Sequence, residues 1–384
     1  MISFAKRISN VEEYYFSKKL AEVRKLDSPG LPVINLGIGS PDLSPPVAAI
    51  EALITTTRKP GVHGYQNYKG VPALRQAIAA FSAKTYGSVL DPETMILPLM
   101  GSKEGIMHIM MAFVDDGDEV LIPDPGYPTY GSVAKLVGAK VRTYEMPINI
   151  DELRKTDFSK VKIMWVNFPH MPTGITASNA ELKQLVDLAR EKQFLIVNDN
   201  PYSLILNDEP ASILAVPNAL DVALELNSLS KSHSMAGWRI GWVAGRHDYI
   251  DAVLRVKSNM DSGMYLGLQQ AAIAALKTED ISLVNSEYKA RKLRALEILE
   301  LLGCTWSTKQ SGLFVWAKVP DHITNVEAWI DDILYSTKVF ITPGFIFGEN
   351  GKRHIRISLC ADQAKLEEAT NRIDDWMEKQ NTGK

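Results

Sequence analysis

The chain has 384 residues, of which 46% are hydrophobic and 23% charged, as in an ordinary soluble globular protein of two or three domains at about 150 residues each. Lys and Arg number 42 against 45 Asp and Glu, and the net charge of -3 with a pI near 6.2 argues against a nucleic-acid partner. Two cysteines are too few for a disulfide framework, and the pattern of neither a signal peptide nor a membrane helix is found, so we expect a cytoplasmic protein without a membrane partner.

In chain order, residues 1–48 are rich in Gly and Pro toward their end and predict an arm that packs with the C-terminal domain. From residue 94 to residue 243, short β-rich runs alternate with helical patterns such as 102–114 and 178–192. Continuously apolar runs such as 163–166 are typical of strands covered on both faces. The predicted strands are 95–99, 119–122, 140–144, 162–167, 194–198, 222–226 and 240–243. They indicate an α/β domain over residues 49–280, with a mostly parallel, helix-flanked sheet.

The pattern changes after about residue 280. A long charged helix is predicted first, and shorter strands and helices follow it. The predicted segments are a helix at 281–302, a strand at 313–316, a helix at 326–335, strands at 339–342 and 354–359, and a helix at 363–378. This order predicts a smaller α+β domain over residues 281–384.

The segment from Ser228 to Gly241 directly follows a predicted apolar strand, at the edge where open α/β sheets bind ligands. It places Lys231 among small residues, where burial would lower the pKa of its amine and make it a nucleophile. Ser228 and Arg239 flank this lysine and suit a phosphate group. A lysine in such a loop is more often merely solvated, so the segment needs support from elsewhere in the chain.

Two further segments give that support. Asp199 follows the apolar strand 194–198, and Tyr202 lies on the same turn. Ser102 and Lys103 stand in a glycine-rich turn between a strand and a helix, whose amides suit an anion. An amine, an acid and an anion pocket together are what pyridoxal 5′-phosphate requires of a protein.

On these residues the chain resembles the class I/II aminotransferases, which are fold-type I pyridoxal-phosphate enzymes. The segment 228–241 is similar to their cofactor-lysine signature, and the resemblance covers nearly the whole chain with an aspartate aminotransferase-like fold. It implies that Lys231 forms a Schiff base with pyridoxal 5′-phosphate. It further implies that the cofactor is bound by Tyr65, Ser102, Lys103, Tyr127, Asp199, Tyr202, Ser228 and Arg239, and the substrate by Gly39 and Arg356.

The resemblance also assigns individual roles. Asp199 would pair with the ring nitrogen, Tyr127 would stack on the ring, and Tyr202 would lie near the ring hydroxyl. Arg356, in a predicted strand, would grip the substrate α-carboxylate, although its alternation with Ile355 and Ile357 also fits the wet face of a half-buried strand. Tyr65 would reach the cofactor phosphate of a neighbouring subunit, which implies a homodimer.

The chain departs from the family at one position. Met171 precedes Pro172 where the family has an asparagine that donates a hydrogen bond to the ring hydroxyl, and methionine has no donor. His170 and Tyr202 are the candidates to compensate. The departure leaves both cofactor tuning and substrate choice open.

The predicted function is a pyridoxal-phosphate-dependent aminotransferase that moves an α-amino group from an amino acid to a 2-oxo acid. Two lyase alternatives within the fold use the same residues: a carbon–sulfur lyase, and an enzyme like aminocyclopropane-carboxylate synthase. A cofactor-binding regulator is a remoter alternative, because such regulators carry an added DNA-binding domain and no segment basic or long enough for one precedes Asn35. The scattered histidines predict no metal site.

Two weaker expectations concern the rim of the site. The segment 259–263 resembles a stretch that approaches the partner's site, and Tyr14 and Tyr15 in the arm are candidates to close over the substrate. The amino donor is not determined by these motifs, since aspartate, a longer polar or aromatic amino acid and a diaminopimelate-type substrate all agree with them.

Overall fold

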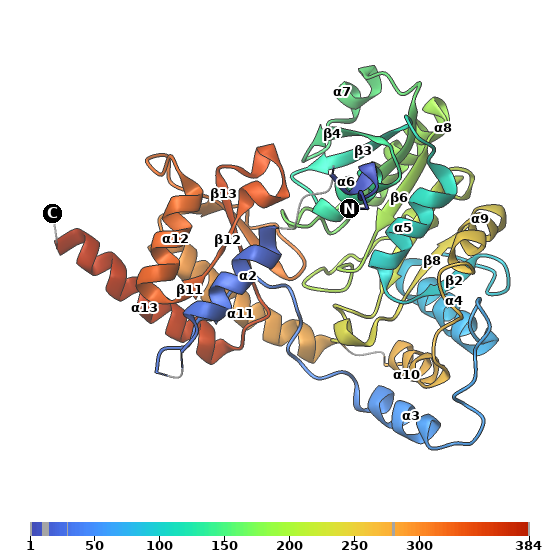
Figure 1. Cartoon of the computed structure of the whole chain (residues 1–384), viewed down its shortest axis with the longest axis horizontal. Helices are drawn as coiled ribbons and strands as arrows, with labels where there is room; N and C mark the ends of the chain where they lie inside the picture. The colour runs from blue at the N-terminus through green and yellow to red at the C-terminus, as the bar shows by residue number, and fades with distance from the viewer. Residues whose placement is uncertain (1, 10–14, 29, 279–280, 383–384) are drawn as a thin grey trace.

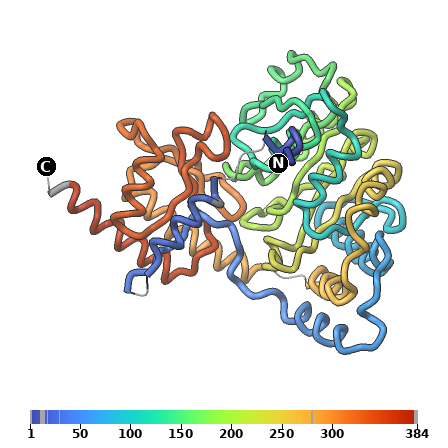
Figure 2. The backbone as a smooth tube through the Cα atoms, in the orientation of Figure 1, coloured from blue at the N-terminus to red at the C-terminus, as the bar shows by residue number. Residues whose placement is uncertain are grey.

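A computed structural model describes residues 2–9, 15–28, 30–278 and 281–382. It forms two parts that lie side by side, one around a large sheet and one around a smaller sheet with α2 (Tyr15–Leu26) of the N-terminal arm and the last helix, α13 (Gln363–Thr382) (Figure 1). The tube in Figure 2 follows the chain from the arm through the larger part and back to the smaller one. Among the described residues no helix is long and apolar enough to cross a membrane.

The larger part holds a seven-stranded sheet in the order β2-β8-β7-β6-β5-β3-β4, in which β8 alone runs antiparallel to its neighbours. Each predicted strand of this sheet is present, with ends shifted by at most two residues. The strands are β2 (Ile96–Leu99), β3 (Glu119–Asp124), β4 (Lys140–Glu145), β5 (Val161–Val166), β6 (Leu195–Asp199), β7 (Ala223–Ser228) and β8 (Gly241–Gly245).

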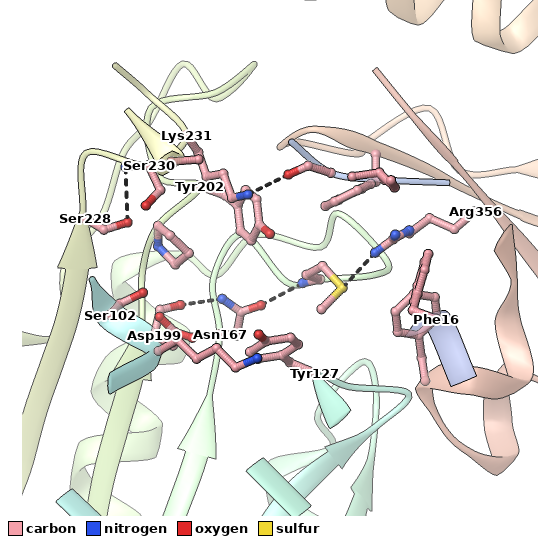
Figure 3. A pocket seen from close by; sticks show the side chains of 18 of the residues that line it. Phe16, Ser102, Tyr127, Asn167, Asp199, Tyr202, Ser228, Ser230, Lys231 and Arg356 are labelled. Carbon is pink, nitrogen blue, oxygen red and sulfur yellow. Dashed lines mark hydrogen bonds between the residues drawn. The ribbon is translucent and has the colours of Figure 1, made fainter. Parts of the chain in front are cut away.

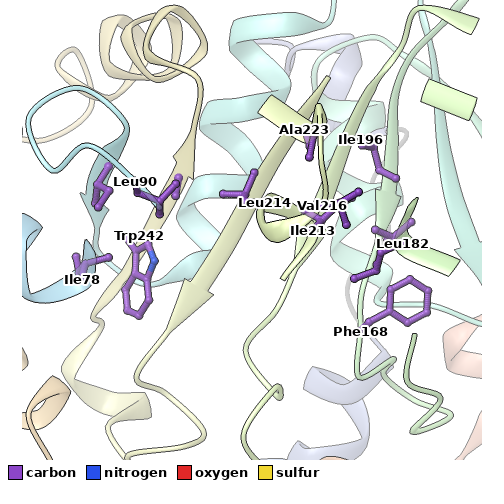
Figure 4. Packing of buried hydrophobic residues seen from close by; sticks show 14 of the residues in the cluster. Ile78, Leu90, Phe168, Leu182, Ile196, Ile213, Leu214, Val216, Ala223 and Trp242 are labelled. Atoms are coloured by element: carbon purple, nitrogen blue, oxygen red, sulfur yellow. The ribbon is translucent and has the colours of Figure 1, made fainter. Parts of the chain in front are cut away.

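Helices cover both faces of this sheet. Successive residues of β5 point to opposite faces, so Met164 joins one buried cluster and Trp165 the other. Figure 4 shows part of the first cluster, where Trp242 and Ile196 of the sheet meet Ile78 and Leu182 of the helices. The helices of this face are α3 (Val47–Thr57), α4 (Pro72–Tyr86), α8 (Asn179–Lys192) and α10 (Leu266–Leu276); those of the other are α5 (Ser102–Phe113), α6 (Pro128–Leu136) and α9 (His247–Lys257). The short α7 (Ile150–Lys155) lies beside α8.

Local signals explain where several helices begin and end. Ser178 caps α8 in a capping box with Glu181, in which each side chain bonds the other's backbone amide. Pro72 opens α4, and Gly87 ends it in the left-handed conformation with φ +72°. These devices satisfy the amides and carbonyls that a helix leaves unpaired at its ends.

The smaller part is built on a four-stranded antiparallel sheet in the order β12-β13-β10-β9. Its strands are β9 (Thr305–Trp306), β10 (Phe314–Lys318), β12 (Thr342–Pro343) and β13 (His354–Ser358), and its helices are α11 (Ser282–Leu301), α12 (Val326–Thr337) and α13 (Gln363–Thr382). The prediction of a single strand at 339–342 was wrong. It divides into β11 (Val339–Phe340) and β12, which belong to different sheets because β11 pairs with the N-terminal arm.

The N-terminal arm contacts both parts. β1 (Ile34–Asn35) pairs with β11 in parallel, and Phe16 and Val23 of α2 (Tyr15–Leu26) lie in the buried cluster of the smaller part. Lys19 joins α2 to α12 through an ion pair with Asp331 at 2.6 Å. The short α1 (Lys6–Ser9), in contrast, lies beside α6 of the larger part. The arm therefore brings α2 to the junction between the two sheets.

Candidate active site

A cavity of about 410 Å³ lies at the carboxyl ends of the parallel strands, where the larger sheet faces β10 and β13. Open α/β sheets bind ligands at this edge, because the loops that follow neighbouring strands meet there. Figure 3 shows side chains from both parts of the molecule pointing into the cavity. It is a shared site, so neither part forms it alone.

Lys231 lies in the turn after β7, and its Nζ donates a hydrogen bond to the carbonyl of Gly39 at 2.6 Å. Burial lowers the pKa of this amine, while the nearby Cys360 opposes the shift and the positive charges of Arg356 and Arg239 add to it. A lowered pKa increases the neutral fraction of the amine near pH 7. Lys231 is therefore suited to act as a nucleophile and as a base.

Asp199 ends β6 and is 5% exposed. Its Oδ2 accepts a hydrogen bond from the Tyr130 hydroxyl at 2.8 Å, while its Oδ1 is buried with no hydrogen-bond partner among the described residues. Burial raises the pKa of this carboxyl to about 6, and the bond from Tyr130 and the charge of Lys231 limit the rise. The unpartnered oxygen thus suits a cationic N–H group of a ligand.

Two side chains fix the position of Asp199. Tyr130 stacks on Trp165 of β5 with ring centroids 4.9 Å apart, which holds its hydroxyl against the carboxylate. Asn167, directly after β5, donates to the backbone carbonyl of Asp199 and accepts from the Met171 amide at 2.7 Å. Tyr130 therefore holds the carboxylate of Asp199, and Asn167, at the end of the neighbouring strand β5, holds its backbone.

The first turn of α5 and the loop after β7 form a cradle for an anion at one end of the cavity. Gly101 precedes α5 with φ +88°, and a Cβ on it would lie 2.3 Å from Nη2 of Arg239. Ser102, Ser228 and Arg239 all line the cavity around this point. A helix N-terminus, two hydroxyl groups and a guanidinium together favour a phosphate group.

Arg356 of β13 lies at the opposite end of the cavity and is buried. Its Nη2 donates to the carbonyl of Gly37 at 2.7 Å, and its Nη1 lies 3.2 Å from the sulfur of Met171. Its guanidinium carbon is 3.9 Å from the ring centroid of Phe314. The guanidinium is thus held in one orientation, and such a planar fork suits a carboxylate.

The predicted site residues come together with one exception. All of the following line the cavity: Gly39, Ser102, Lys103, Tyr127, Asp199, Tyr202, Ser228, Lys231, Arg239 and Arg356. Tyr65 does not line it and is 93% exposed. The segment 259–263 lies against the same loop, since a Cβ on Gly263 would come 2.6 Å from the carbonyl of Gln66.

Two expectations about the rim and the Met171 position were wrong. The Tyr15 ring does not line the cavity and packs edge-on against Phe345 with centroids 5.2 Å apart, because the next residue, Phe16, is the one that faces inward. Tyr14 lies outside the described residues. His170 does not line the cavity either, and its Nδ1 pairs with the Thr173 hydroxyl at 2.8 Å, so it is not placed to replace the missing asparagine.

Sequence reasoning missed several residues of the cavity. Tyr130 had a signal, since it stands three residues after Tyr127 at the start of a helix and so shares its face. Asn167 also had one, because it ends a buried parallel strand. Phe16 and Phe347 had no signal, because the order of the chain does not tell which side chains the smaller part turns toward the larger sheet.

Comparison with known proteins agrees with this geometry. The family model described as aminotransferase class I and II matches residues 32–373. An LL-diaminopimelate aminotransferase of Dehalococcoides mccartyi is 38% identical over 98% of this chain and 99% of its own length, and one of Oleidesulfovibrio alaskensis is 36% identical over 97% and 98%. The substrate-bound structure of BacF from Bacillus subtilis superposes with a TM-score of 0.91 at 33% identity and covers 98% of both chains.

Proposed function

The chain belongs to the class I and II aminotransferase family and is an amino-acid aminotransferase with the fold predicted from its sequence, and from this premise we propose that pyridoxal 5′-phosphate works in the cavity between β7 and β13. The observation that carries the proposal is the pairing of two groups in one cavity. Lys231 offers an amine of lowered pKa, and Asp199 offers a buried oxygen without a partner. Neither feature is useful to a protein that binds nothing there.

The residues present fit this cofactor. Oδ1 of Asp199 suits the protonated ring nitrogen, and the cradle of Gly101, Ser102, Ser228 and Arg239 suits the phosphate. Tyr127 and Tyr202 line the cavity and supply aromatic surface for the ring. When bound, the cofactor supplies an electron sink for the carbanion that forms at the substrate Cα.

The chain's own residues supply positioning and proton transfer. Arg356 binds the α-carboxylate of the donor and so fixes where its Cα lies. Lys231 removes the Cα proton through Nζ and returns it later, and the burial that lowers the pKa of this amine favours its neutral, basic form. Asp199 stays ionised opposite a positive ring nitrogen, and Tyr130 keeps its second oxygen occupied.

Replacement of Lys231 by alanine tests the proposal. We expect Lys231→Ala to lose the absorbance band of the lysine-bound cofactor and to lower kcat by about 10⁴-fold or more, since nucleophile and base are removed together. The matched control is Lys292→Ala, because burial also lowers the pKa of Lys292 but its Nζ bonds the carbonyl of Gln310 outside the cavity.

The control should keep both the band and the activity within about threefold. An active Lys231→Ala protein with an unchanged band would contradict the assignment of the lysine. Turnover that needs no 2-oxo acid would instead indicate lyase chemistry. LL-diaminopimelate, the substrate in the names of the relatives, belongs among the donors tested.

We also propose a homodimer in which Tyr65 completes the partner's site. The support is its 93% exposure on a loop with no contact to the chain's own cavity, while Arg75 at the start of α4 holds that loop through the carbonyl of Gly70 at 2.8 Å. We likewise propose that the chain divides into an arm (1–48), a large domain (49–280) and a small domain (281–384). We also propose that the protein is cytoplasmic.

A further inference from the structure

The part of the cavity that surrounds Arg356 has an apolar lining. Phe16 and Leu20 of α2, Ile38 of the arm, Met171, Phe314 and Phe347 form this lining, which we call the apolar wall. None of these side chains is a polar partner in the contacts that we propose for the cofactor or for the substrate α-carboxylate. The wall is therefore the surface that a substrate side chain would meet.

Aromatic rings surround the guanidinium of Arg356. Its Cζ lies 3.9 Å from the ring centroid of Phe314, 4.6 Å from that of Phe347 and 5.8 Å from that of Phe16. A carboxylate bound to this guanidinium stands beside the same rings. We therefore expect the substrate atoms that follow this carboxylate to lie near aromatic surface, which favours apolar and above all aromatic groups.

A charged side chain would find little to pair with at this wall. Among the described residues that line the cavity, Asp199 is the one carboxylate, and its second oxygen is taken by Tyr130. Of the cations, Lys231 and Arg239 lie with the proposed cofactor, and Lys103 is exposed to solvent at the anion cradle. Within one subunit, a second carboxylate or ammonium at the wall would lose its hydration without a partner, which is unfavourable.

Met171 and Phe16 make the wall apolar at two places that the backbone fixes. Met171 presents a polarisable thioether to Arg356 where the family has an amide, and thioethers pack well against aromatic groups. Phe16 is held by α2, which the ion pair between Lys19 and Asp331 anchors to α12. A ring fixed in advance binds a partner with a smaller loss of conformational entropy.

We propose that this aminotransferase selects amino donors with an apolar or aromatic side chain, and that Phe16 is a specificity-determining residue. The inference rests on the proposed function. It differs from what the relatives' names suggest, since LL-diaminopimelate carries a second ammonium and a second carboxylate at its far end.

The test measures the single-turnover rate of each donor from the absorbance of the bound cofactor. We expect L-phenylalanine and L-leucine to react at least about tenfold faster, at equal low concentration, than LL-diaminopimelate, L-aspartate and L-glutamate. Phe16→Ala should lower the rate for phenylalanine about 10- to 100-fold more than the rate for alanine, which has no side chain to reach the ring. LL-diaminopimelate or a dicarboxylic donor faster than phenylalanine would overturn the proposal.

The control is Phe158→Ala, which also removes a buried ring, since Phe158 is 5% exposed against 8% for Phe16 but stacks on Phe194 in the larger part. It should leave the ratio of phenylalanine to alanine unchanged. Should Phe16→Ala not fold, Ile38→Lys replaces it, because Ile38 is 39% exposed and a lysine side chain there can reach solvent. That variant should shift the preference at least about tenfold toward L-glutamate, because it supplies a cation to the second carboxylate.

A binding measurement separates this inference from the proposed function. Calorimetry with the unreactive acids 3-phenylpropionate and glutarate should give at least about tenfold tighter binding of 3-phenylpropionate, and Phe16→Ala should remove that preference. If no donor reacts, the proposed function fails while this comparison still decides the substrate class. Equal binding of the two acids would overturn the inference even in an active enzyme.

Discussion

Two buried titratable groups of the site are shifted in opposite directions by the same cause. Burial lowers the pKa of Lys231 and raises that of Asp199 to about 6, because in both cases it disfavours the charged form. The site thus holds two groups in states that are unfavourable for folding. Such groups are typical of functional positions, where binding of a ligand compensates them.

The raised pKa of the Asp199 carboxyl predicts that the stability of the cofactor-free protein depends on pH. The pKa of this carboxyl is about 6 in the folded state against roughly 3.9 when unfolded, so between these values the folded state binds more protons. Stability therefore falls as the pH rises through this window. Asp199→Asn should stabilise the cofactor-free protein by about 3 kcal/mol at pH 7.5 and by little at pH 4.

Chemical denaturation at the two pH values measures this difference. Asp248→Asn is the control, because Asp248 is an exposed carboxylate whose pKa is lowered by Arg246 and whose replacement should not stabilise the protein at pH 7.5. A stabilisation by Asp199→Asn that is the same at both pH values would contradict the raised pKa.

At the scale of elements, the proposed anion cradle depends on how the chain enters α5. The chain reaches this helix through Gly101 at φ +88°, and the guanidinium of Arg239 occupies the space where a side chain would begin. Only glycine allows both the left-handed backbone and this close approach. The geometry of the cradle therefore depends on one residue before the helix as much as on the helix itself.

Gly101→Ala should weaken binding of pyridoxal 5′-phosphate by about 10- to 100-fold, because the new Cβ displaces Arg239 and the strained φ costs about 1–2 kcal/mol. A fluorescence titration of the cofactor-free protein measures the dissociation constant. Gly87→Ala is the matched control, since Gly87 also has a positive φ, +72°, but a Cβ there meets nothing within 4 Å. It should lower stability by about 1 kcal/mol and leave the dissociation constant unchanged; equal losses of affinity in both variants would refute the role of the cradle.

At the scale of the whole molecule, the site draws on segments that are far apart in sequence. The Lys231 amine bonds the carbonyl of Gly39 from the arm, and Arg356 of the smaller part bonds the carbonyl of Gly37. Two bonds of 2.6 Å and 2.7 Å thus tie the arm between the larger and the smaller part. Any movement of the smaller part would carry Arg356, Phe314 and Phe347 with it.

The proposed dimer predicts complementation between two inactive variants. Lys231→Ala lacks the amine but keeps Tyr65, and Tyr65→Ala has the reverse defect, so a mixed dimer would hold one intact site if Tyr65 acts on the partner. After unfolding and refolding of an equal mixture, we expect about a quarter of the wild-type activity. Because Tyr65 is exposed, we expect Tyr65→Ala to fold like the wild type.

Two controls accompany the refolding experiment. The variants refolded separately should each stay far below this value, and Tyr68→Ala, on the same loop and 42% exposed, serves as a matched replacement that should stay active by itself. An inactive mixture, or a chain that is active as a monomer, would contradict the shared site.

The family, the fold class and most of the polar residues that line the cavity were predictable from the order of residues along the chain. The strands were predictable because continuous apolar runs such as 163–166 report burial on both faces, and this holds whatever the strand order is. Lys231, Asp199 and Ser102 were predictable because each follows or precedes such a strand, and the carboxyl ends of parallel strands meet at one edge. Local order along the chain is enough for both conclusions.

The remaining features depend on contacts between segments that lie far apart in the chain. The division of 339–342 between two sheets depends on pairing with β1, which lies some 300 residues earlier in the chain. That Phe16 rather than Tyr15 faces the cavity depends on the rotation of α2 against the smaller part. The raised pKa of Asp199 and the aromatic surroundings of Arg356 likewise arise from burial by distant segments, which no local pattern encodes.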